Sequence, residues 1–149
     1  MSNLLHNDRG SVGRWIIIII IVAAAFFGYQ YVKKTPRYAL IQFKKSVMFS
    51  NAESTQKFID LDKVIPGLPD SYTNKEPDEA VKRRLLGELD SPTEKSFFKP
   101  VKEWSVITVP ITVSQNQMSA SAVPIEGTRV VLEKAKQDQW IITALEISK

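Results

Sequence analysis

Residues 128–147 read TRVVLEKAKQDQWIITALEI, and this stretch decides what kind of fold the chain adopts. Residues 129–136 and 140–147 are rich in β-branched and other apolar residues, which is typical of β-strands. Gln137 and Asp138 lie between the two runs, where a tight turn is expected. The stretch therefore predicts two antiparallel strands near the end of the chain.

Two more strands are predicted directly upstream. Apolar residues alternate along 107–113, with Trp104 at the start of that run. Residues 118–125 form the second candidate, which is again flanked by polar and turn-forming residues. Together with the closing pair, these segments predict an antiparallel sheet of about four strands.

The residues before the strands carry helix signals. Thr35 suits an N-cap and Pro36 the first helical position, and Leu40, Phe43 and Val47 then share one stripe of the helix. This pattern predicts a first helix whose apolar side packs on the sheet.

Two further helices follow in the predicted order. Asn51 is expected to cap a second helix that continues through Phe58 and Ile59, and Asp60 to begin a short turn. A third helix opens at Pro77 and ends before Ser91-Pro92. About three helices before about four strands predict an α+β fold, with the helices on one face of a curved sheet.

An uninterrupted apolar segment precedes this domain. Residues 15–32 read WIIIIIIVAAAFFGYQYV and contain no charged residue. Eighteen helical residues span about 27 Å, which is close to the hydrocarbon thickness of a bilayer. Trp15 at one end and Tyr29 and Tyr31 at the other are placed as interfacial anchors. We therefore expect a tail over 1–14, a transmembrane helix over 15–32 and a small α+β domain over 33–149.

Two other interpretations of the N-terminus compete with an uncleaved anchor. In a cleaved signal peptide, residues 16–22 would form the apolar region and the alanines at 23–25 the cleavage site. Against this, the apolar run continues through Phe26 and Phe27. The stretch 7–13 also resembles the leader of bacterial pilin-like proteins, although Trp15 stands where that leader has glutamate.

The net charge of +4 is concentrated beside the apolar segment. From Met48 onward the chain has 13 basic and 15 acidic residues, so the domain surface does not suit nucleic acid. Five basic residues lie just after the apolar segment without an intervening acid, and we expect them to contact lipid headgroups: Lys33, Lys34, Arg37, Lys44 and Lys45.

Membrane orientation follows from two opposing features. The richer basic flank lies on the C-terminal side, which taken literally places the domain in the cytoplasm. The short tail with Arg9 and Arg14 is instead typical of a cytoplasmic region before a signal anchor. We expect the second arrangement, a single-pass cell-membrane protein with an extracytoplasmic domain.

The domain lacks the residues that many catalytic and metal sites require. The chain has no cysteine, and its one histidine, His6, precedes the apolar segment. No phosphate-binding loop, GxSxG or HExxH motif is present. We therefore expect no catalytic residue, no cofactor and no bound metal.

A few residues remain as candidates for a site. Asp60 and Asp62 form an acidic pair, for which helix capping is the simpler interpretation. The aromatic residues Tyr38, Trp104 and Trp140 are expected to line a pocket or, more simply, to fill the core. The basic run at 82–84 is interpreted as a solvated helix face.

The helix-then-sheet order resembles the cystatin-like and nuclear-transport-factor-like superfamily of small domains. The segments that carry this resemblance are PRYALIQFKKSV at 36–47, KFIDLDKVIPGL at 57–68 and the closing stretch at 128–147. Together they are similar to a bacterial family of membrane-anchored domains of this shape. The resemblance covers 36–149 and implies the fold but no particular activity.

These features favour a non-enzymatic, membrane-tethered binding or scaffold domain of the bacterial cell envelope. Its expected partners are the lipid bilayer and a protein of the envelope. One alternative is a subunit of a secretion, conjugation or pilus assembly machine that crosses the membrane once. Another is a small-molecule enzyme with an Asp/Tyr site in the concavity of the sheet, for which Asp60 is the candidate.

Overall fold

The computed structural model describes residues 9–90 and 97–147. Residues 1–8 of the predicted tail and the helix end predicted at Ser91-Pro92 lie outside the described residues. The chain divides into two compact units, Met1–Lys33 and Lys34–Lys149.

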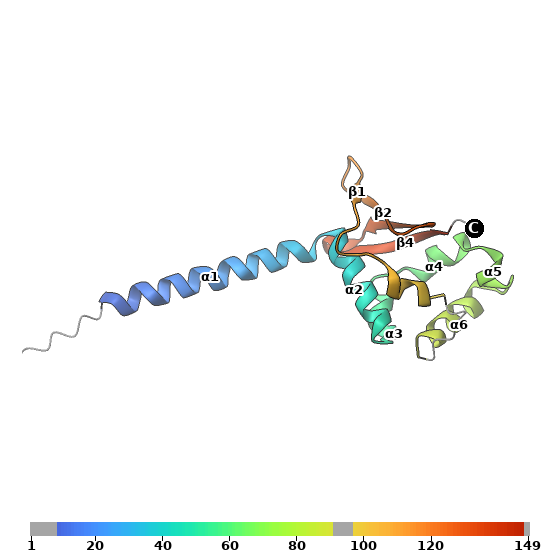
Figure 1. Ribbon diagram of the computed structural model, residues 1–149, viewed down its shortest axis with the longest axis horizontal. Helices are drawn as coiled ribbons and strands as arrows, with labels where there is room; N and C mark the ends of the chain where they lie inside the picture. The colour runs from blue at the N-terminus through green and yellow to red at the C-terminus, as the bar shows by residue number, and fades with distance from the viewer. Residues whose placement is uncertain (1–8, 91–96, 148–149) are drawn as a thin grey trace, which may run out of the picture. The chain divides into compact units, whose positions relative to one another are not determined.

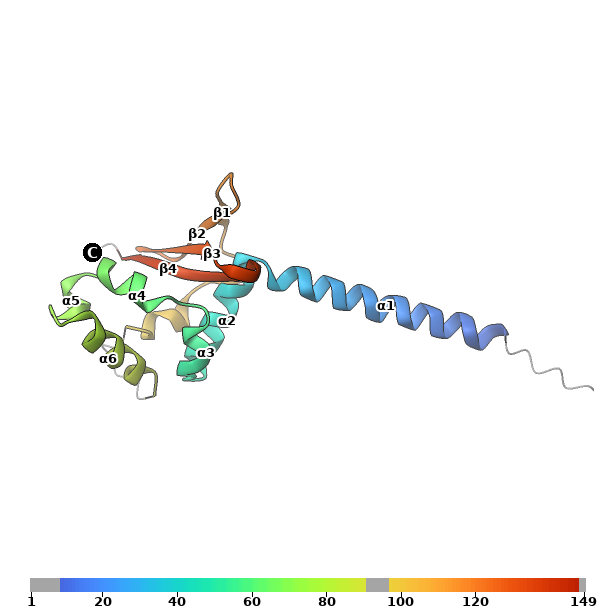
Figure 2. The same cartoon turned by 180° about the vertical axis from the view of Figure 1, so that it is seen from behind.

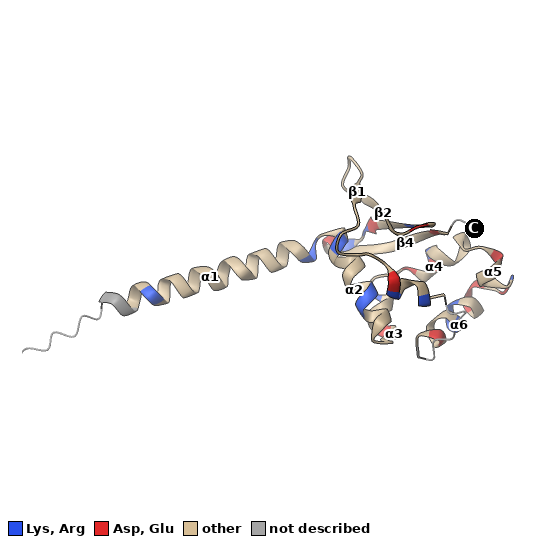
Figure 3. Ribbon diagram, viewed as in Figure 1, with Lys and Arg blue, Asp and Glu red and all other residues tan. Residues whose placement is uncertain are grey.

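The described residues of the first unit form one long helix, α1 (Arg9–Lys33), drawn in blue in Figure 1. The 22 residues Val12–Lys33 are long and apolar enough to cross a membrane. A signal sequence near an N-terminus has the same length and composition. The length of Val12–Lys33, about 33 Å, matches a hydrocarbon core of about 30 Å. Figure 3 shows basic residues only towards the two ends of this helix.

The second unit begins with α2 (Pro36–Met48). Thr35 caps it, because its hydroxyl oxygen accepts a hydrogen bond from the Tyr38 N–H at 3.3 Å. The predicted stripe is buried, with Leu40, Phe43 and Val47 each at most 3% exposed. The predicted cap and the predicted apolar face of this helix are therefore confirmed.

The next helix, α3 (Ala52–Gln56), is shorter than predicted. Asn51 caps it as expected, with Oδ1 accepting from the Ser54 N–H at 2.8 Å. The predicted continuation through Phe58 and Ile59 is wrong, because these residues pair in parallel with the last strand. Ile142 donates its N–H to Phe58 O at 2.9 Å and accepts the Asp60 N–H at 2.8 Å.

Five further helical segments complete the helical layer of the described residues. They are α4 (Leu61–Val64), the 3₁₀ helix η1 (Ile65–Gly67), α5 (Asp70–Thr73), α6 (Asp78–Asp90) and the 3₁₀ helix η2 (Lys99–Glu103). The described part of the domain thus has more helices than the three predicted. Three of its five α-helices have only four or five residues, too few for a recognisable apolar period.

The strands form one antiparallel sheet in the order β1-β2-β3-β4. They are β1 (Ile111–Val113), β2 (Ser119–Ile125), β3 (Thr128–Lys134) and β4 (Trp140–Ile147). A 3₁₀ turn, η3 (Lys136–Asp138), joins β3 to β4 where the tight turn is predicted. The predicted α+β class with four antiparallel strands is confirmed.

The strand predicted over 107–113 is largely wrong, because only Ile111–Val113 joins the sheet. Pro110 precedes that strand and has no N–H to donate to a ladder. The carbonyls of Val106, Ile107 and Val109 are instead bound by the side chain of Arg37.

The core lies between the helices and one face of the sheet. Figures 1 and 2 show the helices of the domain gathered on that face, while no described helix of the domain covers the opposite face. On β3, Val130 and Leu132 point into the core and are fully buried, whereas Arg129 and Glu133 on either side of them are exposed. The uncovered face is the sheet surface that remains accessible for binding.

Candidate functional site

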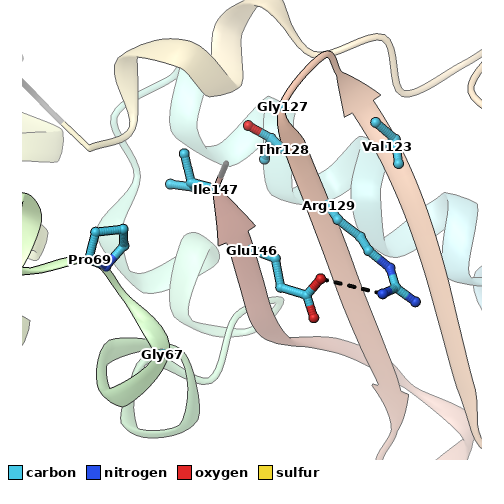
Figure 4. Close-up of a pocket in the computed structure, with 8 residues that line it drawn as sticks. All are labelled: Gly67, Pro69, Val123, Gly127, Thr128, Arg129, Glu146 and Ile147. Atoms are coloured by element: carbon cyan, nitrogen blue, oxygen red, sulfur yellow. Dashed lines mark hydrogen bonds and ion pairs between the residues drawn. The ribbon is translucent and has the colours of Figure 1, made fainter. Parts of the chain in front are cut away.

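A hollow of about 530 Å³ lies at one end of the sheet. It is formed where β3 begins and β4 ends, beside the loop after η1, as Figure 4 shows. Its lining residues are Gly67, Pro69, Val123, Gly127, Thr128, Arg129, Glu146 and Ile147. We refer to these eight residues as the sheet-end hollow.

The sheet-end hollow combines one ion pair with apolar walls. Arg129 and Glu146 are cross-strand partners, and Arg129 Nη1 lies 3.4 Å from Glu146 Oε2. Their side chains are 54% and 60% exposed, so little free energy is needed to exchange this pair for another partner. Val123, Pro69 and Ile147 supply the apolar contacts. The arrangement suits binding of a charged or polar segment with an apolar part.

Sequence reasoning did not anticipate the sheet-end hollow. The local signal was the sequence Glu126-Gly127 between two strands, where Gly127 takes a φ of 77° that glycine adopts without strain. The other wall comes from Gly67 and Pro69, about sixty residues earlier in the chain. No short-range pattern predicts that these two turns meet.

A smaller hollow of about 200 Å³ contains the predicted acidic pair. Lys82 Nζ lies 2.8 Å from Asp62 Oδ1, and this hydrogen-bonded ion pair raises the pKa of Lys82. Asp60 occupies the N-cap position of α4, but its side chain makes no capping hydrogen bond there. The residues lining this hollow include no tyrosine, and no group of three metal-ligating side chains occurs among the described residues.

The three predicted pocket aromatics have separate neighbours. Tyr38 meets Phe58 edge-to-face at 6.5 Å between ring centroids, and Trp104 lies 5.7 Å from Phe43 in the core. The indole N–H of Trp140 donates to Lys34 O at 2.9 Å. Trp104 and Trp140 are 3% and 4% exposed, so both contribute to the core.

The five predicted lipid-contacting residues differ in what they touch. Lys33 lies over the Tyr29 ring at 4.2 Å, Lys34 pairs with Asp138 at 3.4 Å, and Lys45 is exposed. Arg37 and Lys44 instead point across the domain, where Lys44 Nζ donates to Trp104 O at 2.8 Å. Two of the five cations therefore bind backbone carbonyls within the domain.

Arg37 is expected to stabilise the domain through these carbonyls. Its guanidinium donates to Val106 O at 3.1 Å, to Val109 O at 2.8 Å and to Ile107 O. Replacing Arg37 with methionine should lower the free energy of unfolding by about 2 kcal/mol, because charged donors to carbonyls contribute about 1.5–3 kcal/mol. Urea unfolding of the purified protein measures the loss.

Arg37→Lys keeps the charge but not the planar fork that reaches several carbonyls at once. We expect it to recover only a small part of the lost stability. Full recovery would show that charge alone is required and would contradict the role of the fork.

Asp138 lies between two lysines at the β3–β4 turn. Lys134 Nζ lies 3.0 Å from Asp138 Oδ1 and Lys34 Nζ lies 3.4 Å from Oδ2. The hydrogen bond and charge of Lys134 lower the pKa of Asp138 below its ordinary value of 3.8, with a smaller effect from Lys34.

This lowered pKa predicts how stability depends on pH. Because the folded-state pKa lies below 3.8, the contribution of Asp138 is fully present above that value and is lost as the pH falls through the folded-state pKa. Asp138→Asn should be less stable than the unsubstituted protein near neutral pH, and the difference should disappear in acid. Asparagine tolerates the φ of 61° at this position, so backbone strain should not contribute to the difference in stability between the two proteins.

Unfolding curves of both proteins at pH values from about 3 to 7 provide the measurement. A difference that stays constant over this range would contradict the proposed role of the ionised carboxylate.

The candidate site therefore consists of the sheet-end hollow, with a smaller acidic hollow beside β4. Both hollows offer charged groups beside apolar walls. No protein-family profile, curated protein or solved structure matches this chain.

Proposed function

We propose that this chain is a single-pass membrane protein whose domain binds a protein of the cell envelope without catalysing a reaction. The apolar helix Val12–Lys33 supports the tether. The domain begins directly after it, with only Lys34 and Thr35 between α1 and α2. We also propose the cystatin-like and nuclear-transport-factor-like superfamily for this domain, on the basis of its helix-then-sheet order.

The observation that carries the binding proposal is the sheet-end hollow beside an uncovered sheet face. Both strands of the closing hairpin contribute to it, so its walls rest on the most extensively paired part of the domain. Arg129 and Glu146 are both exposed beside the apolar walls, so a partner can reach them. A partner that presents a carboxylate and an apolar side chain could pair with Arg129 and pack against the apolar lining residues.

A photo-crosslinking residue at position 123 tests this proposal. Val123 is 56% exposed and lines the hollow, whereas Phe49 is 73% exposed and lies outside it at the end of α2. We expect a defined crosslinked protein from position 123 in intact membranes, and no such product from position 49. The same products from both positions, or none from position 123, would overturn the proposed site.

Arg129→Ala should weaken the recovered interaction by about 1 kcal/mol or more, roughly fivefold. Lys57→Ala is the matched control, because Lys57 also forms an exposed ion pair, with Glu53 at 3.1 Å. Equal losses for both variants would indicate a general effect of surface charge.

We further propose that the domain is extracytoplasmic, which the basic residues Arg9 and Arg14 before the apolar stretch support. A tag appended after Lys149 tests this orientation by labelling in intact cells. Protection of the tag until the membrane is permeabilised would overturn the outside location and move the partner to the cytoplasm.

A further inference from the structure

One apolar side chain is exposed on a backbone segment that is otherwise firmly held. Ile107 is 74% exposed, whereas Val106 and Val109 on either side are 5% and 4% exposed. Arg37 binds the carbonyls of all three residues, and Lys44 binds that of Trp104 just before them. The hydrogen bonds to Arg37 hold this backbone in place, and the Ile107 side chain points outward from it.

The segment that presents Ile107 is attached to the start of the domain. Arg37 is the second residue of α2 and follows Lys34 by three positions. The Lys34 carbonyl accepts the Trp140 indole N–H, and its ammonium pairs with Asp138. The first residues of the domain, the β3–β4 turn and the 106–109 segment are therefore joined by direct contacts at one corner.

This corner carries an excess of positive charge. Lys34 is exposed there, and the β3–β4 turn adds the exposed Lys136 and the partly buried Lys134. Asp138 is the acid that pairs with two of these lysines. We define Lys34, Ile107, Lys134 and Lys136 as the N-terminal corner.

The covalent connection limits the distance between the last residue of α1 and the first residue of α2. Lys33 and Pro36 are three residues apart in the chain, so their Cα atoms are separated by at most about 11 Å. The headgroup layer on one side of a bilayer is about 5–7 Å thick. If α1 ends at the hydrocarbon boundary, the first residue of α2 therefore lies within the headgroup layer or within about 6 Å of its outer edge.

We propose that the N-terminal corner binds the surface of an anionic membrane, with Ile107 inserted between headgroups and the lysines beside lipid phosphates and carboxylates. An exposed isoleucine near lysines is complementary to this surface. The isoleucine buries apolar area among the lipids, and the lysines are attracted to the anionic headgroups. The proposal rests on the proposed membrane anchor. Arg37 and Lys44 are not among its lipid contacts, since their charged groups are bound to backbone carbonyls of the domain.

The absence of cysteine from the chain allows a direct test with single-cysteine variants. Ile107→Cys and Phe49→Cys are labelled with an environment-sensitive fluorophore in the full chain. The two sites are matched in exposure, at 74% and 73%. They differ in position, because Phe49 follows the far end of α2, about 20 Å along that helix from its first residue. A third label at Tyr29→Cys reports on α1.

Each labelled protein is reconstituted into vesicles of phosphatidylcholine with phosphatidylserine, with and without brominated acyl chains as quenchers. We expect a blue-shifted emission and the loss of most of the intensity at position 107, with neither change at position 49. Vesicles without phosphatidylserine should show much weaker quenching at position 107. Thermal unfolding of each variant confirms that the domain is folded.

Position 29 separates the two proposals. Quenching at 29 without quenching at 107 overturns the lipid-binding corner and leaves the membrane anchor in place. No quenching at 29 overturns the anchor and, with it, this inference. Equal quenching at 107 and 49, or quenching at 107 that does not depend on phosphatidylserine, also overturns the anionic-surface proposal.

Discussion

Replacing Ile21 and Val22 together with arginine should move this protein from the membrane fraction into the soluble fraction. Both residues lie in the middle of the apolar part of α1. An arginine at the centre of a membrane helix costs about 2.5–3.5 kcal/mol on insertion scales. Two of them cost about 6 kcal/mol, which corresponds to roughly a 10⁴-fold change in partition.

Fractionation of carbonate-washed membranes, followed by immunoblotting of both fractions, measures this partition. The matched control replaces the same two residues with leucine, which keeps the segment apolar and should stay in the membrane. Residues 34–149 form a separate compact unit, so the domain should unfold at the same temperature in both variants. Full membrane retention of the double-arginine variant would contradict insertion of α1 as a transmembrane helix.

The parts of this fold that were predictable are those whose signals are local. The strand predicted over 140–147 is β4 (Trp140–Ile147), because this stretch is rich in β-branched and apolar residues and the turn before it contains polar residues. Thr35 and Asn51 were recognisable as caps because each binds an N–H only three residues away. The apolar run in α1 was visible from composition alone.

The predictions that failed depended on contacts between distant residues. Phe58 and Ile59 continue an apolar period that suggests helix, yet their backbone pairs with Ile142, more than eighty residues later. The 107–110 segment alternates like a strand, but Arg37 supplies its hydrogen-bond partners from a helix. A strand and an extended segment bound by side chains have the same sequence period, so periodicity does not distinguish them.

The candidate site illustrates the same limit. The cluster of five basic residues was visible in the sequence, but its division into membrane-facing and internal cations was not. Arg37 and Lys44 lie seven residues apart on α2, so both project to the same side, towards 104–109. Which side of α2 faces the domain follows from the packing of Phe43 and Leu40 between them.

Phe43→Ala should have the largest effect on the stability of the domain itself. Phe43 is fully buried and contacts Phe98 at 6.4 Å and Trp104 at 5.7 Å between ring centroids. It thereby joins α2 to η2 and to the residue that precedes the 105–109 segment. Removing a buried phenyl ring costs about 3–5 kcal/mol, from lost burial and from the cavity that remains.

This loss is a large part of the 5–15 kcal/mol that stabilises a typical domain. Urea unfolding followed by tryptophan fluorescence measures it, because Trp104 and Trp140 are both buried in the folded domain. Lys45→Ala is the control on the same helix and should change stability by less than about 0.5 kcal/mol, since Lys45 is exposed. Because Phe43 also packs beside the Lys44–Trp104 contact, its loss should loosen the segment that presents Ile107 and reduce lipid quenching at that position. An unfolding midpoint equal to that of Lys45→Ala would contradict the central place of Phe43 in the core.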